Sequence, residues 1–134
     1  MMRKYSDDGK VRRHHRVQEL VRQELSAILT REVKDPRVRG LTITEVLLKP
    51  DLKSAIVRVC KFMGDKGVLE EPTTEEKEEL MDGLQASSHF IYERLKRALV
   101  MKVIPSIRFE YDHHLAEASR LWSVVKSATE GDAA

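Results

Sequence analysis

The chain has 134 residues, a length typical of one domain that folds around its own core without disulfides or bound metal. Hydrophobic residues make up 41% and charged residues 34%, and no stretch approaches the ~20 apolar residues of a membrane span, so we expect a soluble, cytoplasmic protein. The single cysteine, Cys60, excludes an internal disulfide, and the formal net charge of +2 is by itself weak evidence for a nucleic-acid partner.

The distribution of charge is more informative than its sum. Residues 1–22 carry seven basic side chains against three acids, and residues 83–108 carry five against Glu93. Residues 69–82 carry seven acids and only Lys77 as a base. Because a phosphate backbone responds to the local field, the two basic segments are candidates for contact with a polyanion.

In chain order, residues 1–12 are polar and predict a flexible basic tail. From about Arg13 apolar residues recur at three- and four-residue steps, which predicts a helix that ends before Asp35-Pro36. Residues 41–48 and 55–62 are rich in β-branched residues and are joined by a short turn, so they predict an antiparallel hairpin.

After a loop at residues 64–74, Thr73 and Glu76 have the spacing of a capping box at the start of a second helix. The small, polar residues 85–89 favour a kink or break in that helix. Alternating residues 107–112 predict a third, half-buried strand parallel to the second, and a last helix follows. The prediction is an α+β fold with a three-stranded sheet and helices packed over it, over residues 13–128, and a disordered C-terminus at 129–134.

Basic and hydroxyl side chains form the candidate set for binding a nucleic acid. Arginine suits phosphate because its planar guanidinium donates two parallel hydrogen bonds, and cations at a helix N-terminus oppose the helix dipole, so stability alone would not select them there. The alternative for each cluster is an ordinary solvated surface. The predicted set is Arg12, Arg13, Arg16, Arg22, Arg37, Arg39, Ser87, Ser88, Arg94, Arg97 and Lys102.

Other kinds of site find little support in the sequence. The pairs His14-His15 and His113-His114 have no further ligands at metal-binding spacing, and no nucleophile elbow or phosphate-binding loop is present, so we expect no metal, no cofactor and no enzyme. The aromatic residues Phe109, Tyr111 and Trp122 stand at core periods, so we expect recognition by shape and backbone charge rather than by stacked bases.

The order of these elements and several short segments resemble the ribosome-binding factor A family. The segments are Arg16-Val17, Asp35-Pro36-Arg37, residues 41–46, residues 51–55, the broken helix around Ala86, and residues 104–112. The resemblance covers roughly residues 10–128, and it implies a KH-like domain of the second type.

The resemblance also implies a function and one departure. The family acts on a late precursor of the small ribosomal subunit near the decoding site and the rRNA 5′ end, and it promotes rRNA processing. The resemblance implies that this chain is a cytoplasmic monomer. Its helix break has an Ala-x-Gly motif, and here the kink motif is Ala86-Ser87-Ser88, with serine in place of glycine. Either the kink keeps ordinary helical angles or Ser88 is mildly strained.

A second function class stays open on the sequence alone. A KH-like scaffold that binds no RNA would serve as a protein–protein adaptor, with the acidic residues 69–82 as its working surface.

Overall fold

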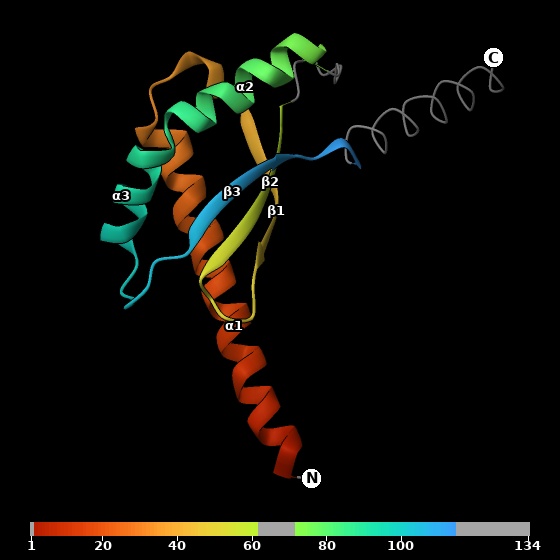
Figure 1. Cartoon of the computed structure of the whole chain (residues 1–134), viewed down its shortest axis with the longest axis vertical. Coiled ribbons are helices and arrows are strands. Elements are labelled where there is room, and N and C mark those ends of the chain that lie inside the picture. The colour runs from red at the N-terminus through yellow and green to blue at the C-terminus, as the bar shows by residue number, and fades with distance from the viewer. Residues whose placement is uncertain (1, 62–71, 115–134) are drawn as a thin grey trace, which may run out of the picture.

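The computed structural model of the chain describes residues 2–61 and 72–114, with side chains described from residue 9 onward (Figure 1). The predicted last helix beyond residue 114, Trp122, and the C-terminus at 129–134 lie outside the described residues, as does most of the loop at 64–74.

Helix α1, Met2–Ala27, is longer than the sequence analysis predicted. It was expected to begin near Arg13, and residues 1–12 were assigned to a flexible tail, whereas α1 begins at Met2 and its first turns extend beyond the sheet (Figure 1). Gly9 is tolerated inside it at a cost of about 1 kcal/mol relative to alanine. Arg12, Arg13 and Arg16 therefore do not oppose the helix dipole, because the dipole acts within the first turn and these residues lie well inside the helix.

Two short helical turns follow α1. A π-helical turn η1, Ile28–Glu32, ends with the Val33 N–H donating to the Ile28 carbonyl at 3.1 Å. A 3₁₀ turn η2, Pro36–Val38, is capped by Asp35, whose carboxylate accepts from the Arg37 N–H. The helical stretch that begins with α1 ends at Glu32, before Asp35-Pro36, as the sequence predicted. Pro36 is the first residue of η2.

The sheet confirms the predicted topology. Strands β1, Leu41–Leu48, and β2, Ser54–Lys61, pair antiparallel, and β3, Ser106–Tyr111, pairs parallel to β2, in the order β1-β2-β3. The β1–β2 register shifts between Ile43 and Glu45, which leaves Thr44 in a bulge, and its hydroxyl donates to Asp112 Oδ2 at 2.6 Å.

The predicted broken helix is two helices. Helix α2, Thr74–Ala86, begins with the predicted capping box, in which the Glu76 N–H donates to Thr73 Oγ1 and the Thr73 N–H donates to Glu76 Oε1, both at 3.2 Å. Helix α3, Ser88–Ala98, follows after the single residue Ser87.

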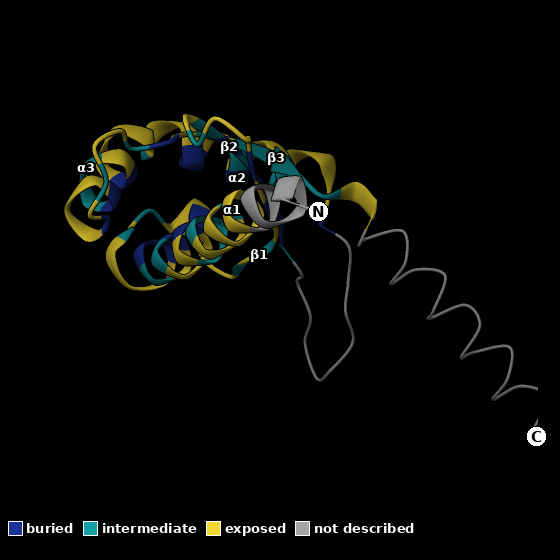
Figure 2. Ribbon diagram, turned by 90° about the horizontal axis from the view of Figure 1, so that it is seen from below, coloured by how far each residue is buried: buried dark blue, intermediate teal, exposed yellow. Residues whose placement is uncertain are grey.

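Apolar side chains from α1, the sheet, α2 and α3 form one core. Figure 2 shows buried residues on the inner sides of the helices and exposed residues on their outer sides. On β2 successive side chains point to opposite faces of the sheet, which places Val57 and Val59 in this core and Arg58 on the opposite face. Phe109 and Tyr111 pack against the core, as predicted. Within the described residues, none of the helices combines the length and the apolar character that crossing a bilayer requires.

Candidate nucleic-acid interface

Helices α1 and α3 lie side by side, and the seam between them bears a row of hollows. Because α3 runs back along α1, the kink before α3 lies beside η1, and the loop after α3 lies beside an earlier part of α1 (Figure 1). We call this side of the molecule the seam face. It is formed by α1, η1, α3 and the loop at residues 99–105.

The first hollow lies at the kink, and we call it the kink groove. It has a volume of about 530 Å³ and is lined by Arg31, Glu32, Val33, Lys34, Ser87, Phe90 and Arg94. A second hollow of about 310 Å³ continues it along the seam, shares Arg31, Glu32 and Arg94, and adds Arg97 and Glu24 to the lining.

A third hollow of about 540 Å³ lies at the other end of the seam. We call it the loop groove. Its basic side chains are Arg13 and Arg16 of α1, Lys53 of the β1–β2 turn, and Lys102 of the loop after α3. Asp51 also lines it.

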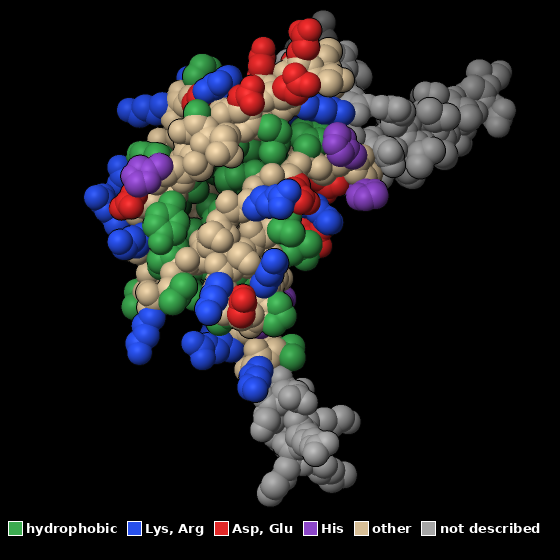
Figure 3. All heavy atoms as spheres, in the orientation of Figure 1, with side chains coloured by type: hydrophobic (Ala, Val, Ile, Leu, Met, Phe, Trp, Pro, Cys, Tyr) green, Lys and Arg blue, Asp and Glu red, His purple; other side chains and the backbone are tan. Residues whose placement is uncertain are grey.

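One stripe of α1 connects the hollows. The α1 and η1 residues that line them recur at steps of three and four: Arg13, Val17, Leu20, Glu24, Ala27 and Arg31. Residues at these steps share one side of a helix, so the loop groove and the kink groove lie on the same side of α1. Figure 3 shows Lys and Arg side chains along this margin of the molecule and around the exposed part of α1.

The cations of the seam face form no ion pair with any residue that the structure describes. This holds for Arg13, Arg16, Arg31, Lys34, Arg94, Arg97 and Lys102. Their guanidinium and ammonium donors remain open to a ligand, and a phosphate group is the ligand that such donors suit best.

Two arginines of the predicted set are instead paired with the chain's own acids. Arg22 donates to both carboxylate oxygens of Glu19, at 2.8 Å from Nε to Oε2, and Arg37 donates to Asp35 at 2.7 Å from Nη2. These pairs raise the pKa of both arginines and lower the pKa of Glu19 and Asp35, mainly through the side-chain hydrogen bonds. Arg37 also lies in the field of Asp82 and Glu79 of α2.

The structure brings together part of the predicted set and leaves the rest elsewhere. The members that line the seam hollows are Arg13, Arg16, Ser87, Arg94, Arg97 and Lys102. The members that line none of these three hollows are Arg12, Arg22, Arg37, Arg39 and Ser88. Arg22 follows Leu20 by two residues, about 200° around the helix, so it lies on the far side of α1 from the seam.

Four further side chains line the hollows and were not predicted from the sequence: Arg31, Lys34, Lys53 and Phe90. Arg31 was detectable, because it continues the stripe of Leu20 and Glu24 in steps of four and seven. Lys34 and Lys53 carry no local signal, since only the packing of η1 and of the β1–β2 turn brings them to the hollows. Unlike Phe109 and Tyr111, which pack against the core, Phe90 is 38% exposed and lines the kink groove.

The kink answers the question left open at Ser88. Ser87 has φ −91° and ψ 0°, and Ser88 is the first residue of α3, with no positive φ. Of the two alternatives, the kink therefore keeps to the ordinary helical side of the φ/ψ map, and serine at position 88 carries no left-handed strain.

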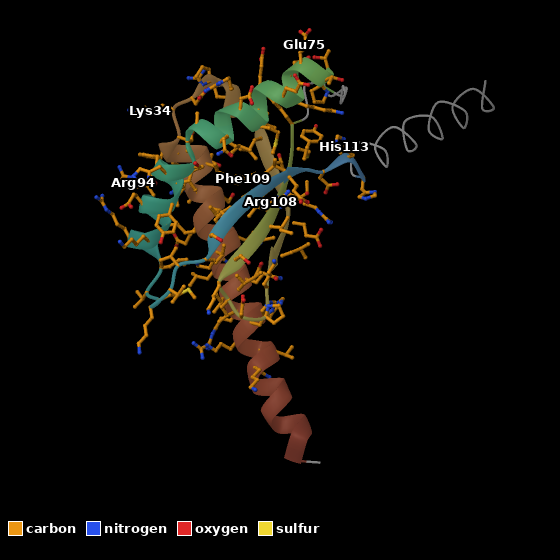
Figure 4. All side chains as sticks on the ribbon, in the orientation of Figure 1. Lys34, Glu75, Arg94, Arg108, Phe109 and His113 are labelled. Carbon is orange, nitrogen blue, oxygen red and sulfur yellow. The ribbon has the colours of Figure 1, made fainter. Side chains whose placement is uncertain are left out.

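The acidic residues at the start of α2 stabilise the helix itself. Glu75 and Glu76 lie in the first turn of α2, where carboxylates stabilise a helix through its dipole, and Glu76 completes the capping box. Figures 3 and 4 show acids gathered at this end, with Glu75 far from Arg94 on α3. Glu75 and Glu76 thus have a role in the fold that needs no partner.

Three side chains with metal-binding or nucleophilic chemistry, His14, Asp112 and Cys60, are engaged in the fold. His14 Nε2 hydrogen-bonds the Leu48 carbonyl, and Asp112 accepts from the His114 N–H at 3.0 Å, as a helix N-cap does. Cys60 is buried, and burial raises the pKa of its thiol to about 11, so a reactive thiolate does not form near neutral pH. Three or more His, Cys, Asp or Glu side chains do not come together as metal ligands anywhere in residues 9–61 and 72–114.

Comparison with known proteins agrees with this architecture. The model of the family described as ribosome-binding factor A matches residues 13–125. A ribosome-binding factor A from Anaeromyxobacter dehalogenans strain 2CP-1 is 40% identical over 121 residues, which cover 89% of this chain and 81% of the relative. One from Dictyoglomus thermophilum is 36% identical over 115 residues, which cover 85% and 88% of the two chains.

Solved structures confirm the KH-like α+β fold. A Thermotoga maritima protein provisionally described as a ribosome binding factor A superposes with a TM-score of 0.59 at 25% identity, over 73% of this chain and 85% of that one. The crystal structure of ribosome-binding factor A from Thermus thermophilus superposes with a TM-score of 0.51 at 20% identity, over 76% and 93%.

Proposed function

The chain belongs to the ribosome-binding factor A family, and from this premise we propose that it binds the immature small ribosomal subunit and its rRNA through the seam face. The observation that carries the proposal is the row of cations along α1, η1 and α3 that form no ion pair within the described residues. The sequence relatives are named for binding the ribosome, and the seam face has the chemistry that such binding requires.

The physical mechanism is docking of a rigid, charged wedge onto folded rRNA. Each Lys or Arg that meets a phosphate releases condensed counterions, so affinity falls steeply with salt. The two ends of the seam, at the kink groove and the loop groove, fix the orientation of the protein on its partner because phosphates must meet both. Docking breaks no covalent bond. The proposed role is that of a binding factor without catalysis, cofactor or metal.

In this proposal the bound protein acts as a monomer in the cytoplasm, where small subunits are assembled. It holds the rRNA near the decoding site and 5′ end in a form that processing enzymes recognise, and it leaves before translation begins. The relatives' names carry no information on processing, so this part rests on the resemblance described above.

The test is co-sedimentation of the full chain with immature small subunits at several salt concentrations. Arg13→Glu/Arg16→Glu is the test variant, and Arg22→Glu/Arg39→Glu is the control, because it changes the net charge equally but lies off the seam hollows. The test variant should bind more weakly and lower the salt slope by about 2, since each phosphate contact contributes roughly 1.

Equal losses in both variants would contradict the proposal, because they would show a response to net charge alone. Unchanged binding of the Arg13→Glu/Arg16→Glu variant would contradict it as well. For the processing role, cells that carry only this variant should accumulate precursor rRNA with unprocessed ends, and normal rRNA ends in cells without the protein would overturn that part.

A further inference from the structure

Phe90 is a large aromatic residue that lies at the surface and not in the core. It lies on the first turn of α3, its side chain is 38% exposed, and it lines the kink groove beside Ser87. Leaving much of a large apolar ring in water forgoes free energy that burial would supply, since apolar area contributes about 25 cal/mol per Å² when buried. An exposed ring within a hollow is therefore a candidate contact for a ligand.

A cation orders the ring. The Arg94 guanidinium carbon lies 5.2 Å from the centroid of the Phe90 ring, within the range of a cation–π interaction. Arg94 follows Phe90 by four residues, so the two side chains meet on the same side of α3. The half-buried Arg94 side chain and the ring thus form one platform, and the arginine forms no ion pair with a described acid.

The opposite wall of the kink groove comes from η1 and the turn after it. Arg31 and Lys34 line this wall together with Glu32, so three cations of the groove, including Arg94, outweigh one carboxylate. Figure 4 shows Lys34 and Arg94 on different elements at the same margin of the molecule. A volume of about 530 Å³ is of the size that holds one small ligand.

An aromatic platform that faces phosphate-binding cations fits one chemical class. A nucleotide carries a flat base that stacks on aromatic and guanidinium planes, and a phosphate that binds Arg and Lys. A base inside a duplex is already stacked on both sides and offers no free plane to Phe90. The groove therefore fits an unpaired nucleotide of a single-stranded or bulged RNA segment.

We propose that the kink groove binds one unpaired RNA nucleotide, with its base stacked on the Phe90–Arg94 platform and its phosphate against Arg31 and Lys34. This deepens the proposed function, on which it rests, by adding base stacking to the phosphate contacts of the seam. It replaces the expectation that recognition uses shape and backbone charge alone.

The experiment measures binding of the full chain to an unstructured RNA 10-mer that contains 2-aminopurine, by anisotropy and by fluorescence quenching. Stacking of 2-aminopurine on the ring quenches its fluorescence, whereas a contact with phosphate alone does not. Phe90→Ala is the test variant. Tyr92→Ala is the matched control, because Tyr92 is an aromatic residue of the same helix, is 37% exposed, and lines none of the seam hollows.

We expect Phe90→Ala to lower affinity for the single strand about tenfold and to abolish the quenching, since stacking on an aromatic residue contributes about 1–3 kcal/mol per base. Tyr92→Ala should stay within twofold of the wild type. The salt slope should be unchanged in both variants, because neither removes a charge. Thermal unfolding checks that both variants fold.

The inference would be overturned by binding of Phe90→Ala at wild-type affinity, by equal affinity for a blunt duplex of the same length, or by quenching that Tyr92→Ala also abolishes. If the wild type binds no single strand yet co-sediments with small subunits, the proposed function stands and this inference fails. If Phe90→Ala then loses subunit binding, the groove contacts another part of the subunit than a single-stranded nucleotide, which also overturns the inference.

Discussion

Two sets of arginines on this protein differ in what they contact. Arg22, Arg37 and Arg58 donate to carboxylates of the same chain at 2.7–2.8 Å. The cations of the seam face form no such pair within the described part of the chain. A paired arginine must first break its hydrogen bonds to the carboxylate before it can bind a phosphate. The number of basic residues in a segment is therefore a poor guide to its affinity for phosphate.

The largest expected loss of affinity follows from charge reversal at the kink groove. Reversing two charges there, Arg31→Glu/Arg94→Glu, should lower affinity for the immature subunit about 100-fold, since a charge-assisted hydrogen bond contributes about 1.5–3 kcal/mol. Filter binding at fixed salt measures this. The control is again Arg22→Glu/Arg39→Glu, and a change of less than threefold in the test variant would remove the kink groove from the interface.

A second change perturbs the paired region and leaves the seam intact. A Cβ at Gly83 of α2 would lie 3.0 Å from Arg37 Cβ and 3.0 Å from Val38 Cγ2. Gly83→Ala should therefore lower the free energy of unfolding by about 1–2 kcal/mol, because overpacking outweighs the gain in helix propensity. Urea unfolding measures this, and subunit affinity should not change. A more stable variant would show that η2 moves freely to accept the methyl group.

A third change sharpens the comparison from the acidic side. Glu24 and Glu32 line the seam hollows and repel phosphate. Glu24→Gln/Glu32→Gln should raise subunit affinity about threefold, which corresponds to about 0.7 kcal/mol. Glu75→Gln/Glu78→Gln on α2 changes the net charge equally, away from the seam, and should have less effect. An equal rise in both variants would indicate a response to net charge rather than to the seam.

A fourth change tests the kink at Ser88. Because Ser88 has helical geometry and lines none of the seam hollows, Ser88→Gly should lower the free energy of unfolding by about 0.5 kcal/mol, from the lower helix propensity of glycine. Subunit affinity should stay the same. Chemical unfolding and co-sedimentation of the same preparation measure both quantities, and a stabilised variant would argue for strain at this position.

The smallest expected effect concerns a paired acid. The Arg37 side chain and backbone N–H lower the pKa of Asp35 below its ordinary value of 3.8. A carboxyl with a lowered pKa stabilises the folded state above its unfolded pKa, and this contribution is lost as pH falls through the folded pKa. Asp35→Asn should therefore be less stable than the wild type at pH 7, and the difference should shrink below pH 3.8. A difference in urea midpoint that does not change between pH 7 and pH 3 would contradict this.

The periodicity of the sequence predicted the fold well because its signals are local. The capping box at Thr73, the proline turn after Asp35 and the alternation in residues 107–112 each act within a few residues, and the structure has each of them. The predicted start of α1 near Arg13 was wrong, because polar residues and one glycine do not stop a helix that no proline interrupts. The limits of the domain at residue 128 stay a prediction.

The sequence by itself determined the element types, the hairpin, the parallel third strand and the basic character of α1 and α3, because spacing and residue type act through neighbours in the chain. The tertiary structure alone decided which cations line the seam hollows. Lys53 and Lys102 are far apart in sequence yet line one groove, and Arg37 lies in the field of acids of α2. Charge acts through space, so its effect depends on packing between elements, which no single segment encodes.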